Sequence, residues 1–391
     1  MKTILRTFVG CTAILFGTAC MGAVKYVPEN MKVELSLKVP GNNAVNYKLH
    51  PDKLENSYFD YEWRSDNKLP ITVFHKVEER DSCMRLTVQL TAAQDVYFNY
   101  RQLLSTGYRH DNCQFYMPGF WYRRNLRSPK KAPSFHTSDS WLVREDRLSA
   151  PLTGIFSEKE KRFMTVNRLD DFSMDALATH KEGEIILSGK TSLGFTGFEN
   201  QQGIAMLSFG FPYREAPKSY IRKLTLAPEV EAFQLMKKGE SVLLTWEIME
   251  SGADDFSDFI QHTWEHCYDT YVPKPVENSY SIADMKQVLS CFFVNSLVDN
   301  QPLVYNSGIH LKVSDCERNG QAEVGFIGRV LLNAFNAWEY GWQSNREELK
   351  VNSTKIFDSY LKNGFTQAGF FKESVNFDKG YEEPIHSIRR Q

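Results

Sequence analysis

Apolar and polar residues alternate along much of the first part of the chain, which is the pattern of a strand with one buried face. The clearest examples are residues 31–39, 84–90 and 242–248. Glycine, proline and asparagine-aspartate turn signals separate them from other apolar runs, and no long helical pattern interrupts them. The sequence therefore predicts a large antiparallel β-sandwich over residues 24–250.

The pattern becomes helical near Asp254. Apolar residues then recur every three or four positions, as in a helix that packs one face on a core. These residues are Phe256, Phe259, Ile260, Trp264 and Cys267. Because Pro273 and Pro275 follow closely, we expect a linker helix within residues 251–276.

Three further helices are predicted in residues 277–391. Ser281 and Asp284 form a capping-box variant at the start of the first. A polar loop over residues 299–320 separates it from a helix that carries apolar residues from Val324 to Trp338. The last helix begins near residue 345, and we expect Gly364 to end it in a left-handed conformation.

The N-terminus has the pattern of a signal peptide. Lys2 and Arg6 precede an apolar run over residues 7–17 that is too short to span a bilayer. Small residues follow, so we expect a signal peptide over residues 1–23 and a periplasmic protein. Alternatively, Cys20 is a lipidation site that anchors the protein in the outer membrane, although Gly17 stands where such sites usually have leucine.

Composition narrows the function classes. Of the 391 residues, 42% are hydrophobic and 24% charged, and the formal net charge is −2. These values exclude a disordered chain and give no basic surplus for binding nucleic acid. Aromatic residues make up 13%, which suits stacking on sugars and also filling a β-domain core.

Cysteine and histidine spacing does not predict a metal centre. The cysteines beyond residue 23 contain no CxxC pair; they are Cys83, Cys113, Cys267, Cys291 and Cys316. We expect buried free thiols, with a disulfide between Cys83 and Cys113 as the alternative. His262 and His266 have the spacing of one helical face, but no HExxH motif accompanies them. We expect no metal and no cofactor.

Three segments carry a resemblance to a known family. Residues 117–125, 134–141 and 321–329 resemble segments of six-hairpin glycosidases, (α/α)6-toroid proteins with an N-terminal β-supersandwich, as in polysaccharide-utilisation proteins of gut Bacteroidota. The resemblance implies a β-supersandwich, a linker helix and the first helices of a toroid over residues 277–391. A complete toroid has more helices than this chain supplies. We therefore expect either the front portion of a longer protein, with further catalytic groups in later units, or a helical part that packs on the β-domain or on another chain.

Glycoside hydrolysis needs two carboxylates, one acting as an acid and one as a base or nucleophile. The best candidates are Asp315 and Glu323, with Glu317 a weaker one. Arg318, next to Glu317, offers a planar fork to sugar hydroxyls or a uronate. The alternative is that these acids only cap the following helix.

Residues 119–141 are the other candidate region, because aromatic rings alternate there with arginines. The predicted substrate-binding residues are Arg123, Arg124, His136, Asp139 and Trp141. Aromatic rings and arginine guanidinium groups together can bind an acidic glycan, but the same residues also occur in a loop packed against a second domain. Ser138, between His136 and Asp139, does not make a nucleophile triad, because contiguous residues rarely do and no GxSxG elbow is present.

The predicted function is a glycoside hydrolase acting on a complex polysaccharide or oligosaccharide. One alternative is a polysaccharide lyase acting on uronic-acid glycans, with Tyr305, Asn306 and His310 as candidates. The other alternative is a non-catalytic glycan-binding module. The expected partner is a glycan, with membrane contact only through a lipid anchor, and the oligomeric state stays open.

Overall fold

The computed structural model describes residues 27–382, with gaps at 56–57, 59, 81–82, 171–172, 223, 273, 275–276, 299–302, 306–308, 313–314, 319–320, 324–328, 373 and 377–379. The predicted signal segment, including Cys20, lies outside the described residues. The chain forms two compact units, Met1–Pro273 and Lys274–Gln391. No helix in the described ranges is long and apolar enough to cross a membrane.

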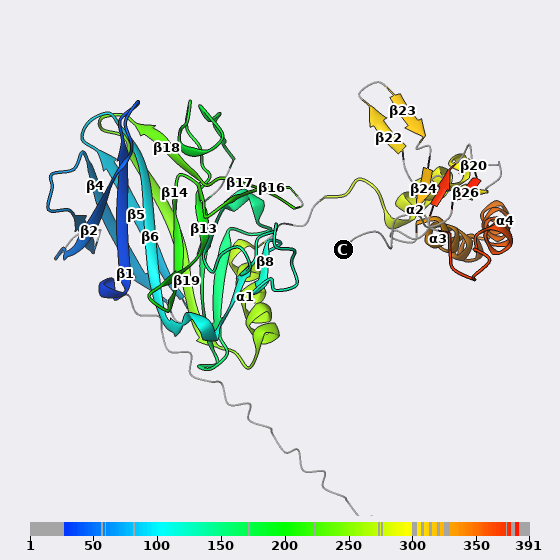
Figure 1. The fold of residues 1–391 in the computed structure, drawn as a ribbon, viewed down its shortest axis with the longest axis horizontal. Helices are drawn as coiled ribbons and strands as arrows, with labels where there is room; N and C mark the ends of the chain where they lie inside the picture. The colour runs from blue at the N-terminus through cyan, green and yellow to red at the C-terminus, as the bar shows by residue number, and fades with distance from the viewer. Residues whose placement is uncertain are drawn as a thin grey trace, which may run out of the picture. The chain divides into compact units, whose positions relative to one another are not determined.

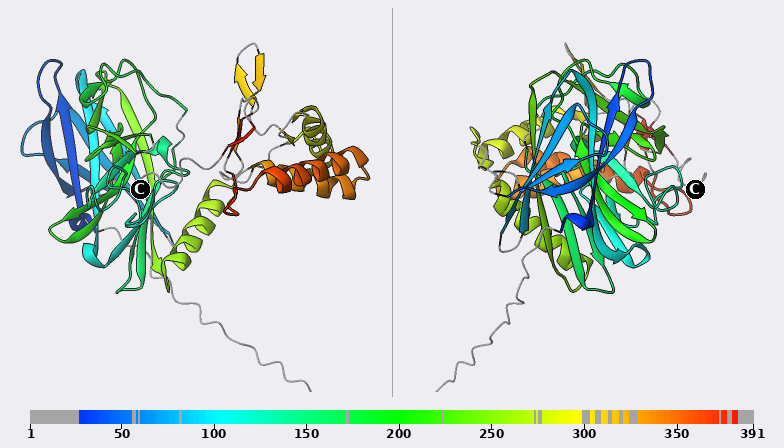
Figure 2. Two further views of the ribbon diagram at one scale, coloured as in Figure 1. Left: turned by 45° about the vertical axis from the view of Figure 1, so that its right-hand side comes forward. Right: turned by 90° about the vertical axis from the view of Figure 1, so that its left-hand side faces the viewer.

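The first unit is a β-sandwich of two layers that share one strand (Figures 1 and 2). One layer has, in spatial order, β2 (Val45–Lys53), β1 (Met31–Lys38), β6 (Val96–Arg109), β14 (Ile204–Phe211), β13 (Phe195–Gln201) and β9 (Trp141–Arg144). The other continues from β2 through β3 (Tyr61–Arg64), β4 (Ile71–Glu79), β5 (Cys83–Ala92), β19 (Ser241–Gly252), β11 (Arg162–Arg168), β10 (Leu152–Ser157), β7 (Cys113–Met117) and β8 (Trp121–Arg123).

Five shorter strands extend this framework. β18 (Val230–Met236) pairs with β6, with β15 (Arg214–Glu215) and, in parallel, with β12 (Gly183–Ile186). β16 (Ser219–Arg222) and β17 (Thr225–Ala227) form a separate hairpin. All the strand pairs of the described β-domain except β12–β18 are antiparallel, which confirms the predicted fold class for this part of the chain.

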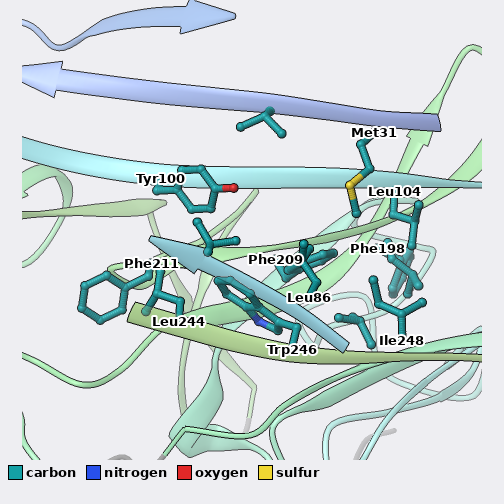
Figure 3. Close-up of a cluster of buried hydrophobic side chains, with 14 of the residues drawn as sticks. Met31, Leu86, Tyr100, Leu104, Phe198, Phe209, Phe211, Leu244, Trp246 and Ile248 are labelled. Carbon is teal, nitrogen blue, oxygen red and sulfur yellow. The ribbon is translucent and has the colours of Figure 1, made fainter. Parts of the chain in front are cut away.

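The core lies between the two layers, as the alternating pattern requires. Met31, Tyr100 and Leu104 from one layer face Leu86 and Trp246 from the other (Figure 3). In the three stretches predicted as strands, the buried residues alternate along β1 and β5, whereas β19 is buried on both faces from Trp246 to Met249. These three predicted strands are confirmed.

Helix α1 (Phe256–Tyr271) packs against the β-domain and belongs to the first unit. Its first turn is capped by the Asp255 carboxylate, which accepts hydrogen bonds from the backbone N–H groups of Ser257 and Asp258 at 2.7 and 3.0 Å. Phe259 is fully buried against β10, where Gly154 leaves space for its ring. The predicted linker helix is therefore present, and it covers part of the sandwich.

The second unit contains three helices and several short strands in its described part. The helices are α2 (Ile282–Asn295), α3 (Arg329–Gln343) and α4 (Glu347–Asn363). The strands are β20 (Leu297–Val298), β21 (Val304–Tyr305), β22 (Ile309–Lys312), β23 (Asp315–Arg318), β24 (Gln321–Glu323), β25 (Ser374–Asn376) and β26 (Gly380–Glu382). Helices α3 and α4 enclose a small core that includes Val330, Leu349, Ile356 and Tyr360.

Two predictions for this unit need correction and one is confirmed. The capping box of Ser281 and Asp284 is present. The segment predicted as a polar loop contains the β22–β23 hairpin. The following helix is described over Arg329–Gln343, and its predicted beginning at residues 324–328 lies outside the described residues. Gly364 has φ −86°, so it is not left-handed; a side chain there would collide with Tyr360, whose carbonyl oxygen would lie 2.6 Å from the added Cβ.

Candidate functional site

A hollow of about 860 Å³ lies beside β7 and β8 in the β-domain. We call it the arginine hollow, because three arginines are among its lining residues. The lining consists of Asp111, Gln114, Tyr122, Arg123, Arg124, Asn125, Leu126, Arg127, Ser128 and Glu158. Most of these come from the region that the sequence indicated, residues 119–141.

The backbone of this region is shaped by Asn125. Arg123 and Asn125 both have left-handed backbones, with φ 57° and 50°, a conformation that asparagine adopts more readily than most residues. The Asn125 side chain holds it in place: its Oδ1 accepts from the N–H of Tyr122 at 3.1 Å, and its Nδ2 donates to the carbonyl oxygen of Pro133 at 3.0 Å. The chain therefore turns sharply after β8 and lines the hollow.

Two of the three arginines form no ion pair with a carboxylate of the described residues, although, after the backbone hydrogen bonds to that carboxylate, the charge of Arg123 contributes to lowering the pKa of Asp255. Arg123 and Arg127 are exposed, and no carboxylate of the described residues forms an ion pair with either guanidinium. The Arg123 guanidinium lies 5.2 Å from the ring centre of Phe256, a cation–π arrangement that holds it without consuming its hydrogen-bond donors. Both side chains can therefore donate to an anionic ligand.

Arg124 has a different, structural role. It is half-buried, and its Nε donates to the carbonyl oxygen of Cys113 at 3.2 Å. Its guanidinium also donates to the carbonyl oxygen of Asp111 and lies 5.2 Å from the ring centre of Phe135. We infer that Arg124 shapes one wall of the hollow, since its donors are partly used by backbone.

The two carboxylates of the hollow are engaged by neighbouring residues. Asp111 pairs with Arg109, and the hydrogen bond from that guanidinium lowers the pKa of Asp111 below its ordinary value. Glu158 accepts a hydrogen bond from the side-chain amide of Gln114. The amide of Gln114 is neutral, so Glu158 keeps its negative charge, but the three arginines outweigh it and the net charge of the lining is positive.

Tyr122 adds an aromatic surface to the hollow. Its side chain is 51% exposed, and its hydroxyl oxygen accepts from the N–H of Gly119 at 3.2 Å. Its ring centre lies 5.4 Å from that of Tyr116, whose hydroxyl oxygen accepts from Trp264 Nε1 at 2.7 Å. The exposed part of the ring is held in position and can stack on a sugar ring.

Three other residues predicted in this region do not line the hollow. His136 is exposed, and its Nε2 lies 2.8 Å from the carbonyl oxygen of Leu126. Asp139 accepts from the side-chain amide of Asn200 at 2.6 Å. Trp141 is fully buried beside Trp121. A ring with no exposed surface cannot stack on a ligand, so the prediction for Trp141 is corrected to a core residue.

The residues that sequence reasoning missed come from other segments. Asp111 precedes β7, Gln114 lies near its start, and Glu158 follows β10. The pairing of Ser157 with Cys113 brings these segments together across the sheet. No local motif marks them, because the sheet register alone makes them neighbours.

The predicted catalytic residues lie in the second unit. Asp315 begins β23, which also contains Glu317 and Arg318, and Glu323 ends β24. The side chains of these residues lie outside the described part of the structure, as do all of Asn306 and the side chain of His310. Their assignment as catalytic or binding residues stays a prediction.

The cysteines of the described part are free thiols. Cys83, Cys113 and Cys267 are buried, and Cys291 is exposed. This confirms the expected free state for these four, while Cys316 lies in β23 with its side chain outside the description.

Comparisons with known proteins give only distant likenesses. No family model matches the chain, and no curated protein matches it. Among solved structures, a polysaccharide lyase matches with a TM-score of 0.30 and 10% identity, over 90% of this chain. The chain spans 56% of the length of that lyase. The Slr1438 protein from Synechocystis sp. PCC 6803 matches with a TM-score of 0.30 and 7% identity, over 55% of this chain and 73% of its own.

Proposed function

We propose that this chain belongs to a carbohydrate-active protein whose β-domain binds an acidic glycan in the arginine hollow. The observation that carries the proposal is the pair of unpaired guanidinium groups, Arg123 and Arg127, in the same hollow as the exposed ring of Tyr122. A guanidinium matches the geometry of a carboxylate with two parallel hydrogen bonds. An aromatic face next to it accommodates a sugar ring.

The size of the hollow agrees with a glycan segment as ligand. Its volume of about 860 Å³ lies within the range of roughly 300–1,000 Å³ that small-molecule sites occupy. Asp111 is paired with Arg109 and Glu158 is hydrogen-bonded to Gln114, so the donors of Arg123 and Arg127 are not used by these two carboxylates and can bind an incoming carboxylate. A neutral sugar uses fewer of these donors, so we expect a uronate-bearing glycan to bind more tightly.

We propose glycoside hydrolysis as the reaction, with Asp315 and Glu323 as the paired carboxylates. Elimination from a uronic-acid glycan is the second candidate, because the acidic glycan that the arginine hollow would bind carries the uronate that this reaction requires. We also propose that residues 1–23 direct export, with Cys20 as the lipidation site in the anchored form.

Binding by the hollow is tested with full-length protein and polygalacturonate in calorimetric titrations. A hydrogen bond to a charged group contributes about 1.5–3 kcal/mol, so Arg127→Gln should weaken binding by about 10- to 150-fold. Lys131→Gln is the matched control, because Lys131 is an exposed cation of the same loop outside the lining. Equal affinity of wild type and the Arg123→Gln, Arg127→Gln double variant contradicts the proposal.

The reaction is tested by digesting neutral and acidic polysaccharides and analysing the products. Hydrolysis produces new reducing ends without ultraviolet absorption, whereas elimination also produces an absorbing unsaturated uronate. Loss of reducing-end formation in Asp315→Asn or Glu323→Gln, with binding retained, supports the proposed carboxylates. Binding without any cleavage in the wild type contradicts the enzymatic part and leaves a binding module.

A further inference from the structure

Three side chains with metal-binding atoms meet where helix α1 packs on the sheet. They are Cys83 at the start of β5, Glu247 in β19 and His266 in α1, and their sulfur, oxygen and nitrogen atoms all lie within 4.8 Å of one another. They come from three segments that are far apart in the sequence, so their meeting is a product of the fold. They do not belong to the lining of the arginine hollow.

We propose that Cys83, Glu247 and His266 form a binding site for a zinc-like divalent transition-metal ion. The donor set is one thiolate sulfur, one carboxylate oxygen and one imidazole nitrogen, which is a set that Zn²⁺ accepts and that Mg²⁺ and Ca²⁺ do not prefer. The site is independent of the proposed glycan binding.

The arrangement of the donors agrees with a single ion between them. His266 Nε2 lies 2.8 Å from a carboxylate oxygen of Glu247, so a small separation of these two groups admits an ion bound by both. Cys83 and Glu247 are buried, whereas the His266 side chain is 22% exposed. A water molecule can therefore reach the fourth position from the solvent side, as in three-ligand zinc sites.

Neighbouring residues hold Glu247 in position for this role. Thr270 Oγ1 donates to the same carboxylate oxygen that His266 contacts, at 3.2 Å, and Arg85 donates to the other oxygen at 3.5 Å. Such second contacts fix the orientation of metal ligands and raise affinity. Glu247 is thus pre-positioned by residues outside the donor set.

Charge balance also favours a divalent ion. Binding displaces the thiol proton of Cys83 to solvent, so a thiolate and a carboxylate balance the two positive charges of the ion, and the neutral imidazole of His266 adds none. Arg85, 3.5 Å from Glu247, stays a neighbouring cation outside the donor set. Without the ion, burial and the nearby Glu247 carboxylate raise the pKa of the Cys83 thiol to about 11. The metal-free cluster is therefore not an activated cysteine nucleophile, because the thiol keeps its proton near neutral pH.

Cobalt(II) titration of the reduced, metal-free full chain tests the site, because the absorption spectrum of bound Co²⁺ depends on which atoms bind it. Wild type should bind one ion per chain with a sulfur-to-cobalt charge-transfer band, and Zn²⁺ should displace it. Cys83→Ser should abolish the band, and His266→Gln should weaken binding by more than about tenfold. Zn²⁺ should also raise the melting temperature of wild type.

The matched controls are variants of two cysteines and one histidine that lie outside the cluster. Cys267→Ser, Cys291→Ser and His262→Gln should keep the band and the affinity, because none of these side chains belongs to the cluster. A folded wild type without the band overturns the proposal, whether or not the variants fold. Retention of the band in folded Cys83→Ser also overturns it.

Discussion

Replacing Gly154 with alanine should push helix α1 away from the sheet. An added Cβ would lie 2.6 Å from Cζ of Phe259 and 3.0 Å from Cγ2 of Thr165, whereas carbon atoms pack best at about 3.5–4.0 Å. Phe259 is fully buried between α1 and the β-domain, so its ring has no free space to enter. Overpacking of this kind costs about 1–3 kcal/mol of unfolding free energy.

A double-mutant cycle isolates the contact. Phe259→Leu removes the colliding ring atoms, so Gly154→Ala should cost less in that background, with a coupling energy of roughly 0.5–3 kcal/mol. Urea unfolding followed by tryptophan fluorescence measures both effects. Gly252→Ala, in the neighbouring region of the sheet, is the matched control, because its Cβ would meet nothing closer than 3.6 Å.

The outcome bears on the metal site as well as on packing. His266 lies in α1, so a displaced helix should also weaken cobalt binding in Gly154→Ala. A Gly154→Ala protein within about 0.5 kcal/mol of wild type, with no coupling to Phe259→Leu, refutes the close contact between α1 and β10.

Three further predictions follow from individual contacts. Trp141→Ala should lower the unfolding free energy by about 3–5 kcal/mol in urea titrations, because the ring is fully buried; an unchanged midpoint contradicts this. Burial is the largest single influence on Glu247 and opposes its charge, but the hydrogen bonds and charges of His266, Cys83 and Arg85 together outweigh burial and lower the pKa of Glu247 from 4.5 to about 2. In metal-free protein its stabilising contribution is therefore complete above pH 4.5 and lost as the pH falls toward 2, so Glu247→Gln should flatten that acid loss in urea unfolding; an equally steep loss argues against it. Ser281→Ala removes the cap of α2 and should cost about 0.5–2 kcal/mol, seen as faster hydrogen exchange of the Asp284 amide; unchanged exchange contradicts the cap.

Elements with a regular local pattern were predictable from the sequence. The strands around Leu35 and Leu86 and helix α1 follow directly from the spacing of apolar residues, because one face of each must be buried. The β22–β23 hairpin was missed because its residues are mostly polar and short strands have little periodicity. The left-handed conformation predicted for Gly364 is wrong because glycine is also required where a side chain would collide with its neighbours, here with Tyr360.

The candidate sites were less predictable, because they depend on contacts between distant segments. The aromatic and arginine-rich region was recognisable, but its pattern did not separate the exposed Tyr122 from the buried Trp141. Glu158 reaches the arginine hollow through the pairing of β7 with β10. Likewise, the sequence spacing pairs His266 with His262, whereas the fold places His266 next to Glu247 and Cys83.

The central claim is that the arginine hollow binds the carboxylates of an acidic glycan. The most direct measurement compares wild-type binding to polygalacturonate and to the same polymer after chemical reduction of its carboxyl groups, at one fixed salt concentration. The two polymers share backbone and length, so charge alone differs. We predict at least about tenfold weaker binding of the reduced polymer, as expected for the loss of one charge-assisted hydrogen bond. Equal affinity for both polymers contradicts the account.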